Sequence, residues 1–413
     1  MSTNKFHELP WDIQPGAPLA PWTYTNPEVF ELDYEAFFLR RWQFVGHVNE
    51  MLEEGSFIAH DIGRDNVFVI RGKDDQLRAF QNVCRHRASR VLEGKGTCKG
   101  VIRCPYHGWT YRLDGRLMSI PQDEHFPDVD KAAHGLHEIQ LEIFHGLVFV
   151  RIKGDGPGIA EHFGSMANFF EKYDVANYVP CAATTTQVWN ANWKVAWDNY
   201  LENYHIPIGH PGLHRLLNSL DEGEDLSSGV GYGVFGLKSK PSSVEVERKY
   251  QEMFHHANER IPEDIKGKWV QIGIAGNLAF DFYPEMVDIF QLIPLGHDRT
   301  MIRTIYYGHP DPTPEEVELR RLNIQINDSV NTEDSVLCER VQKGLQTYGY
   351  SPGPLSRLEV GIHYFHEMVR ELVPVMSLAD APATGQVSVQ NSDLLDKKTR
   401  SPRESKRRIA PVH

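Results

Sequence analysis

Residues 84–107 read CRHRASRVLEGKGTCKGVIRCPYH and contain two short Cys–His pairs. The first pair is Cys84-Arg-His86, and after seventeen further residues comes the second, Cys104-Pro-Tyr-His107. Each pair offers one sulfur and one imidazole, so the two kinds of ligand alternate along the chain. A zinc finger usually pairs Cys with Cys and His with His at its own spacings. The alternation therefore argues for a metal centre other than structural zinc.

A Rieske [2Fe–2S] centre uses this ligand set, with two Cys on one iron and two His on the other. The residues CPYHGW, which begin at Cys104, closely resemble the second half of the Rieske motif. The sequence therefore predicts Cys84, His86, Cys104 and His107 as the cluster ligands. We expect the two pairs on neighbouring loops at the tips of hairpins, near the surface, where an electron donor can reach the cluster.

The remaining cysteines predict no disulfide framework. Of the five, Cys84 and Cys104 belong to the predicted cluster, and the other three, Cys98, Cys181 and Cys338, are scattered. An odd, scattered set is typical of a reducing compartment, which favours a cytoplasmic location. Cys98 lies between the two Cys–His pairs and is interpreted as a free thiol, with a further metal ligand as the alternative.

The composition predicts an ordinary two-domain protein. The chain has 413 residues, of which 41% are hydrophobic and 24% charged. Its net charge of −13 argues against nucleic acid and anionic membranes as partners. The N-terminal residues lack a basic region followed by an apolar one, and no run of eighteen apolar residues occurs, so neither a signal peptide nor a membrane span is expected.

A small β domain is predicted over residues 43–155. Strand patterns separated by turn residues occur at 56–61, 66–70, 77–82 and 146–152. An Asp114-Gly115 pair predicts a hairpin directly after the second Cys–His pair. Residues 1–42 are expected to form an arm, extended over 1–28, and a helix over 27–42 that packs on the second domain.

A larger domain is predicted over residues 156–380, after a GDGPG linker. Its expected elements are a helix at 163–173, a strand at 184–189, and a strand meander at 278–282, 287–293 and 300–307. Thr313-Pro314 with Glu316 forms a capping box, which starts a helix running to about Leu345 with an interruption near residues 327–331.

Three further segments complete the predicted organisation. A helix is expected over residues 358–372. Residues 221–265 are polar and irregular and are interpreted as a loop or lid. Residues 381–413 are interpreted as a flexible tail, because residues 396–413 hold seven Lys or Arg against two acids.

A second constellation of metal-binding residues lies in the larger domain. Asp198, Glu202 and His205 are spaced i, i+4 and i+7, which would place them on one helix face. His210 follows five residues after His205, and the Pro and Gly between them allow the helix to break and bring His210 back. Two imidazoles and one carboxylate are the ligands of non-haem Fe(II) oxygenases, which leave positions open for O₂.

Together these motifs resemble the catalytic α subunit of Rieske ring-hydroxylating oxygenases, over roughly residues 15–370. The resemblance includes Asn192-Trp-Lys194 and the run from Asp198 to His210. It implies an α+β fold, with a small all-β Rieske domain and a larger catalytic domain whose antiparallel sheet is flanked by helices. It also implies iron on His205 and His210, with a third ligand from a late helix. Asp334 is preferred as that ligand, and Glu333 is the alternative.

The resemblance also implies a role for Glu202. In the family an acid at this place links a Rieske histidine of one subunit to an iron histidine of the next, here His107 and His205, in a head-to-tail homotrimer. Many members carry Asp, so Glu202 departs from the common pattern. Asp198 is expected to share this network. The chain contains no NAD or flavin fingerprint, so electrons from NAD(P)H are expected only indirectly, through a flavin- or ferredoxin-type reductase.

The substrate implied by the resemblance is a quaternary ammonium compound. The segments 333–345 and 353–359, and Glu rather than Asp at 202, look like the choline, glycine betaine, carnitine and proline betaine oxygenases. Such enzymes hydroxylate a carbon next to the charged nitrogen, and an N-methyl carbon is then lost as formaldehyde. A methylammonium group needs aromatic faces. The candidates are Tyr200, Tyr204, Phe280, Phe282, Tyr283 and Phe290. The alternatives are an arene dioxygenase forming cis-dihydrodiols and a non-catalytic electron carrier.

Overall fold

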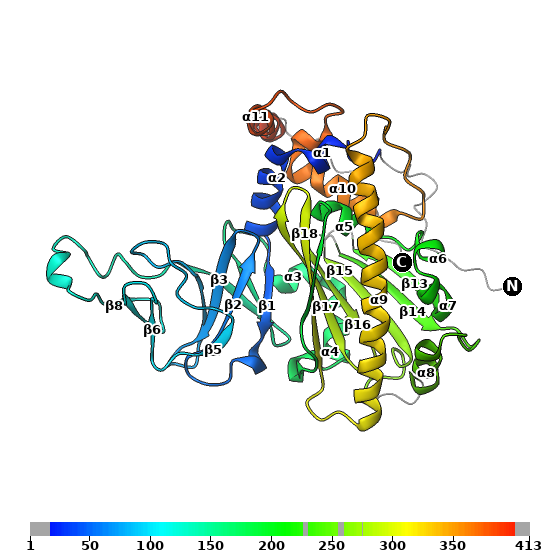
Figure 1. Cartoon of the computed structure of the whole chain (residues 1–413), viewed down its shortest axis with the longest axis horizontal. Helices are drawn as coiled ribbons and strands as arrows, with labels where there is room; N and C mark the ends of the chain where they lie inside the picture. The colour runs from blue at the N-terminus through cyan, green and yellow to red at the C-terminus, as the bar shows by residue number, and fades with distance from the viewer. Residues whose placement is uncertain (1–16, 226–229, 255–259, 275, 401–413) are drawn as a thin grey trace.

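The computed structural model describes residues 17–225, 230–254, 260–274 and 276–400. Two β domains lie beside each other along the long axis of the molecule (Figure 1). The N-terminal domain contacts the larger one through hydrogen bonds such as Asn277 Nδ2 to Gln43 Oε1, 2.7 Å. None of the described helices has the length and apolar character needed to cross a membrane.

The first domain is built on a seven-stranded sheet with the order β1-β10-β9-β4-β3-β2-β5. Its strands are β1 (Gln43–His47), β2 (Ser56–Ile62), β3 (Asp65–Arg71), β4 (Leu77–Gln81), β5 (Lys95–Thr97), β9 (Glu138–Phe144) and β10 (Leu147–Arg151). The strand predictions at 56–61, 66–70, 77–82 and 146–152 are therefore confirmed. Strands β1 and β10, at one edge of this sheet, are buried along their whole length, because they pack against the second domain.

A second, three-stranded sheet at the far end of this domain carries the loop with Cys104 and His107, whereas the loop with Cys84 and His86 joins β4 to β5 of the first sheet (Figure 1). Its strands are β6 (Val101–Arg103), β7 (Thr110–Arg112) and β8 (Leu117–Ser119). The Asp114-Gly115 hairpin joins β7 to β8, as predicted. Gly115 has φ +82°, and a Cβ there would lie 2.3 Å from the ring of Phe80, so this turn requires glycine.

The larger domain has an antiparallel eight-stranded sheet, with the main order β11-β18-β17-β16-β15-β14-β13 and β12 paired to β18. Its strands are β11 (Val179–Pro180), β12 (Thr185–Trp189), β13 (Leu217–Asp225), β14 (Val230–Leu237), β15 (Lys268–Ile274), β16 (Leu278–Phe282), β17 (Val287–Gly296) and β18 (Arg299–Gly308). The predicted meander and the strand at 184–189 are confirmed. The α+β fold class follows from this sheet and its covering helices.

Helices cover both faces of the large sheet. α3 (Ile159–Phe163) and α4 (Ala167–Lys172) pack on one face, where Phe170 contacts Phe280 and Phe282 of β16. The long helix α9 (Pro314–Leu345) crosses the other face (Figure 1). Because side chains alternate along a strand, Asp281, which lies between Phe280 and Phe282, points to the opposite face, where α9 lies.

Two helix predictions need correction. The helix expected over residues 163–173 is broken at Gly164, which has φ +50° and separates α3 from a 3₁₀ turn and α4. The interruption expected near residues 327–331 is wrong, because α9 runs unbroken for 32 residues from the predicted Thr313 capping box. Its polar residues there are accommodated because they turn toward a cavity, where Asn327 donates to the Tyr283 hydroxyl at 2.8 Å.

The loop or lid expected over residues 221–265 is also wrong where the structure describes it. The segment contains most of β13, then β14 and helix α8 (Glu245–Phe254), while residues 226–229 and 255–259 lie outside the described residues. β13 is an edge strand and β14 carries three glycines, so neither shows the apolar alternation expected of a strand.

The two ends of the chain also differ from expectation. Residues 22–25 form a short helix, α1, and the next helix, α2 (Pro27–Asp33), ends in a π-helical turn at Leu39 rather than at Trp42. The helix expected at 358–372 is present as α10 (Val360–Leu372), but another helix, α11 (Val387–Arg400), lies in the predicted tail. Its first residue is fully buried, and it contacts α2. Residues 1–16 and 401–413 lie outside the described residues.

The N-terminal segment packs on the catalytic domain through a buried ion pair. The Asp33 carboxylate accepts from Lys194 Nζ and from Trp193 Nε1, the latter at 3.1 Å. Lys194 and Trp193 begin α5 (Trp193–Tyr200), so this pair anchors α2 to the helix that leads into the metal-binding residues. Removing one partner of such a pair would leave an uncompensated buried charge.

Candidate metal centres and active-site cavity

The two Cys–His pairs lie on adjacent loops of the first domain. Cys84 and Cys104 are buried, with exposed fractions of 3% and 2%. His86 is half-buried and His107 exposed, and their ring centroids are 4.5 Å apart. The sulfurs therefore point inward and the imidazoles outward.

Both loops use the same turn. The amide of Ala88 donates to the carbonyl of Cys84 at 3.1 Å, and the amide of Gly108 donates to that of Cys104 at 3.1 Å. Ala88 and Gly108 both have positive φ, at 55° and 75°. The two turns thus present their Cys and His side chains in matching ways.

The surroundings of the pairs fit a [2Fe–2S] cluster. His86 Nδ1 is buried and has no hydrogen-bond partner, which is unusual unless a ligand occupies it. Trp109 stacks on the His86 ring with centroids 5.0 Å apart and planes 5° apart. The Tyr111 hydroxyl lies 3.2 Å from Cys84 Sγ, where it can donate to the sulfur. Cys98 pairs its backbone with Gly55, and its side chain packs against the core of the domain.

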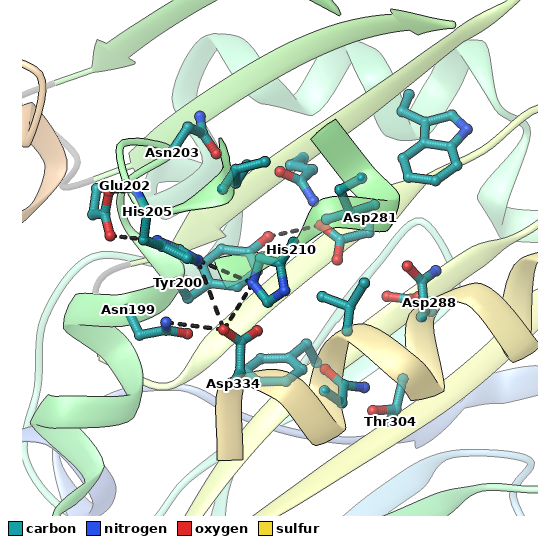
Figure 2. Close-up of a pocket in the computed structure, with 18 residues that line it drawn as sticks. Asn199, Tyr200, Glu202, Asn203, His205, His210, Asp281, Asp288, Thr304 and Asp334 are labelled. Atoms are coloured by element: carbon teal, nitrogen blue, oxygen red, sulfur yellow. Dashed lines mark hydrogen bonds and ion pairs between the residues drawn. The ribbon is translucent and has the colours of Figure 1, made fainter. Parts of the chain in front are cut away.

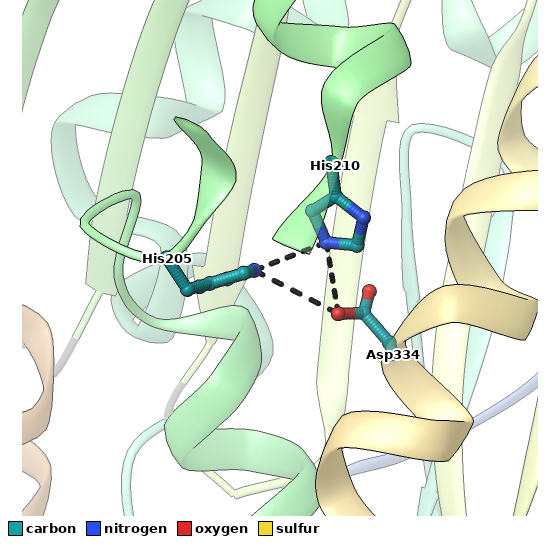
Figure 3. Close-up of side chains that lie close together, drawn as sticks. All are labelled: His205, His210 and Asp334. Atoms are coloured by element: carbon teal, nitrogen blue, oxygen red, sulfur yellow. Dashed lines mark hydrogen bonds and ion pairs between the residues drawn. The ribbon is translucent and has the colours of Figure 1, made fainter. Parts of the chain in front are cut away.

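A second group of side chains that could hold a metal ion lies in the larger domain. His205, His210 and Asp334 each bring one ligand atom into a space in which all three lie within 4.8 Å of one another (Figure 3). The two Nε2 atoms are 3.1 Å apart, and Asp334 Oδ1 is 2.9 Å from His210 Nε2 and 3.7 Å from His205 Nε2. Asp334 comes from α9, so elements far apart in the sequence form this group.

The local backbone differs from the single broken helix that the spacing suggested. α5 ends at Tyr200, so Glu202 and His205 lie in the turn before the short helix α6 (Ile206–Gly209). His210 separates α6 from α7 (Pro211–Leu216) and has φ −125° and ψ 75°. The Pro and Gly do permit the chain to turn His210 toward His205, as expected.

Two carboxylates hold the outer nitrogens of the histidines. Glu202 accepts from His205 Nδ1 and, through Oε2, from its backbone amide at 3.0 Å. Glu333 Oε2 lies 2.8 Å from His210 Nδ1. With Nδ1 occupied on both rings, the Nε2 atoms face the centre, and Asp334 rather than Glu333 points at the same space.

The electrostatics of this group suit a cation. Burial lowers the pKa of His210, but Asp334 and Glu333 outweigh that effect and raise it above its usual value. The carboxylates therefore favour positive charge at the centre. Two imidazoles and a carboxylate fit Fe(II), which would replace the proton on binding.

Asp198 does not join this group, contrary to expectation. Its Oδ2 accepts from the Tyr24 hydroxyl at 2.7 Å, and its Oδ1 lies 3.1 Å from His366 Nε2. Tyr24 belongs to α1 and His366 to α10. Asp198 thus ties the N-terminal segment and a late helix to α5, because its side chain points away from the metal-binding turn.

A cavity with a volume of about 80 Å³ adjoins the three metal-binding side chains (Figure 2). Among the aromatic candidates, Tyr200 and Phe290 line it, stacked with centroids 5.5 Å apart and planes 16° apart. Phe280 and Phe282 lie fully buried on the opposite face of β16. They were wrong candidates, because strand alternation turns them away from the cavity.

The other two aromatic candidates do not line the cavity either. Tyr204 is 59% exposed. Tyr283 is buried in the next layer, where its hydroxyl donates to Asp288 Oδ2 at 3.3 Å.

Sequence reasoning missed Trp269, Asp281 and Asp288, all of which line the cavity. The two acids carried a usable sequence pattern. Each lies between two large apolar residues of a buried strand, in Phe280-Asp-Phe282 and Val287-Asp-Ile289. An acid in such a strand must have a specific reason for its burial.

Comparisons with known proteins agree with both metal centres. The family model for the Rieske [2Fe-2S] domain matches residues 41–133, and that for the ring hydroxylating alpha subunit (catalytic domain) matches residues 171–374. The glycine betaine monooxygenase oxygenase subunit of Chromohalobacter salexigens is 29% identical over 392 residues, which cover 87% of this chain and 86% of the relative. The carnitine monooxygenase oxygenase subunit of Escherichia coli is 29% identical over 374 residues, covering 86% and 95%.

Solved structures show the same fold. The quaternary ammonium Rieske monooxygenase CntA in complex with L-carnitine has a TM-score of 0.73 at 25% identity, over 89% of this chain and 99% of that one. A naphthalene 1,2-dioxygenase with indole bound has a TM-score of 0.70 at 19% identity, over 94% and 98%, and shares the fold.

Proposed function

This chain belongs to the Rieske-type non-haem iron oxygenases, and we propose from that membership that it hydroxylates a quaternary ammonium compound at a carbon next to its nitrogen. At an N-methyl carbon the product would lose formaldehyde, leaving a demethylated amine. The observation that carries the proposal is the placement of His205, His210 and Asp334 beside a cavity with the stacked rings of Tyr200 and Phe290. Aromatic faces are what a methylammonium group requires.

In this proposal His205, His210 and Asp334 hold the mononuclear iron, and Cys84, His86, Cys104 and His107 hold the cluster. When bound there, the iron would supply the O₂ chemistry and the cluster would supply the electrons for it. Glu333 orients His210 by accepting from Nδ1, and Asn199 Nδ2 donates to Asp334 Oδ1 at 3.0 Å, which fixes the carboxylate. These contacts leave the ligand atoms preorganised before metal binds.

Glu202 is proposed to connect the two centres across a subunit boundary. Within one chain the cluster loops lie at the opposite end of the molecule from α6 and α7 (Figure 1). His107 is exposed, and beside Glu202 the side chains of Tyr204 and Ile208 are 59% and 88% exposed, which supports a protein contact there. A head-to-tail homotrimer would bring His107 of one subunit to the Glu202–His205 pair of the next.

The electron donor is proposed to be a separate reductase of the flavin or ferredoxin type that oxidises NAD(P)H. The glycine betaine and carnitine relatives are named as oxygenase subunits, which implies such a multicomponent system. Residues 84–116 hold eight Lys or Arg and two acids in a chain of net charge −13. This basic surface around the cluster would attract an acidic donor protein. The five free cysteines support a cytoplasmic location.

An arene dioxygenase is the second candidate, because the naphthalene dioxygenase shares this fold. The cavity favours the first candidate. Its lining includes Asp281, Asp288 and several amides, whereas a hydrocarbon would need mainly apolar walls.

The test is turnover of a panel of quaternary amines and arenes with a reductase and NADH. We expect formaldehyde and a demethylated amine from at least one ammonium compound, and no cis-dihydrodiol. Release of formaldehyde from none of them would refute the proposal. A His205→Ala variant that keeps the visible spectrum of the cluster and loses turnover would exclude a mere electron carrier.

A further inference from the structure

Two buried carboxyl groups face each other in the cavity wall, and neither belongs to the metal centre. Asp281 on β16 lies directly opposite Asp288 on β17 in the sheet register. Their exposed fractions are 8% and 3%, and both line the cavity (Figure 2). Two acidic side chains thus lie side by side in one wall of the cavity, where a bound cation would favour their ionised form.

The pair has only neutral partners. The Tyr200 hydroxyl donates to Asp281 Oδ1 at 2.7 Å, and the Tyr283 hydroxyl donates to Asp288. None of the 18 lining residues, all within the described chain, is Lys or Arg. Burial raises the pKa of Asp281 to about 7, and burial together with Asp281 raises that of Asp288 well above its usual range. Buried acids are normally paired with a cation, and this pair lacks one.

The aromatic rings of the cavity complete a binding site for a cation. Tyr200 donates to Asp281 and stacks on both Trp197 and Phe290, so a stack of three rings lies next to the acid pair, and Phe290 rather than Trp197 lines the cavity. An alkylammonium group is attracted by ring faces and by carboxylates without needing a hydrogen bond. Both kinds of group line the same wall here.

The remaining polar side chains cannot neutralise an anion. They are amides and one hydroxyl, from residues such as Asn203, Gln271, Thr304 and Asn331. Amides can bind a hydroxyl group of the substrate. A substrate carboxylate, in contrast, would lie in a cavity that offers it two acidic side chains and no Lys or Arg to pair with.

We propose that Asp281 and Asp288 bind the cationic nitrogen of the substrate and select cations that carry no carboxylate. Choline-like amino alcohols would then be preferred to zwitterions such as glycine betaine and carnitine, for which the bacterial relatives are named. This inference rests on the proposed oxidation of quaternary ammonium compounds and states which members of that class the cavity accepts.

The test is calorimetric binding to the iron- and cluster-loaded enzyme. The probes are choline, its uncharged isostere 3,3-dimethylbutan-1-ol, and glycine betaine. We expect choline to bind at least about tenfold more tightly than either of the others, a difference that calorimetry resolves easily. Asp281→Asn and Asp288→Asn should each reduce the preference for choline over its isostere, whereas Glu285→Gln, a buried acid outside the cavity lining, should preserve it.

Two results would overturn the subsite: glycine betaine binding as tightly as choline, or both Asp→Asn variants keeping the wild-type preference. The ratio of the affinities for choline and glycine betaine is measured on the wild-type enzyme, so a variant that fails to fold cannot obscure that result. If glycine betaine both binds best and yields formaldehyde, the subsite is wrong while the proposed function stands. If no ammonium compound binds or reacts, both are wrong.

Discussion

At the scale of single residues, two adjacent acids on α9, Glu333 and Asp334, approach different nitrogens of the His210 ring. Glu333 meets the Nδ1 side of His210, whereas Asp334 meets its Nε2 side together with His205. Their order along the helix separates the two carboxylates by about 100° around its axis. One can therefore act as a ligand and the other as its support.

This difference predicts distinct effects on metal content. Asp334→Asn should lose the mononuclear iron, because a neutral amide replaces the anionic ligand. Glu333→Gln should keep it with affinity reduced by about 10–100-fold, the usual effect of removing an orienting partner. Total iron and acid-labile sulfide per chain measure this, since sulfide reports the cluster separately. Equal iron loss in both variants, or loss only in Glu333→Gln, would contradict the assignment of Asp334 as the ligand and Glu333 as its orienting partner.

The proposed role of Glu202 predicts that a change at this residue impairs electron transfer without affecting metal binding. Glu202→Gln should retain iron and the cluster spectrum but lower turnover by about 10–100-fold, because the amide no longer accepts strongly from both histidines. The readout is re-oxidation of the reduced cluster by O₂ in the presence of substrate, followed in a stopped-flow instrument. Glu202→Asp, which keeps the charge, is the matched control and should be less affected. Re-oxidation at the wild-type rate in Glu202→Gln would contradict the role.

At the scale of elements, the packing of α8 and α9 on the sheet depends on a buried acid. Glu285, 2% exposed after β16, accepts from Tyr250 of α8 at 3.0 Å and from Asn323 of α9 at 2.8 Å. Its Oε2 has no hydrogen-bond partner. Burial raises the pKa of this carboxyl to about 7.

The raised pKa predicts how stability varies with pH. Below pH 4.5 Glu285 is protonated in both states, and between pH 4.5 and about 7 the folded protein binds more protons than the unfolded one. Stability is therefore lost as pH rises through that window, by about 2 kcal/mol between pH 5 and 7. Melting temperatures of the wild type and Glu285→Gln should converge at low pH and diverge as pH rises. Glu252→Gln, an exposed change on α8, should follow the wild type. If the melting temperatures of Glu285→Gln and the wild type changed in parallel with pH, Glu285 would not be the source of the pH dependence.

At the scale of the whole molecule, the separation of the two centres decides how many chains are needed for activity. The cluster loops and the metal-binding turn lie at opposite ends of one chain (Figure 1). If Glu202 connects the centres as proposed, a complete electron path would require two copies, with the basic loops of one near Glu202 of another.

Mixed oligomers provide the test. A Cys84→Ser chain lacks the cluster and a His205→Ala chain lacks the iron, so each alone should be inactive. Co-expressed and purified through two different tags, the mixed oligomers should regain part of the wild-type turnover, because an intact cluster can face an intact iron site of its neighbour. Co-expressed chains that form mixed oligomers without activity would place the electron path inside one subunit.

The proposed metal ligands could be selected from the sequence because their chemistry demands particular residue types at short spacings. Cys-x-His, Cys-x₂-His and the two histidines five apart occupy single turns, where local backbone geometry brings the side chains together. The strands of the first domain and the capping box of α9 are likewise local patterns. The glycine-rich strand β14 and the edge strand β13 could not be predicted from the sequence, because they are stabilised by pairing in the sheet rather than by local strand preference.

The sequence by itself thus determined the two kinds of metal centre and the fold class, since both depend on local spacing and periodicity. Only the tertiary structure showed that Asp334 and Glu333 contact opposite nitrogens of His210. It also showed that Asp198 contacts Tyr24 rather than the iron histidines, and that Asp281 lies opposite Asp288. These relations join elements far apart in the chain, and their geometry follows from helix rotation and strand register. Neither can be inferred from the residues of one segment alone.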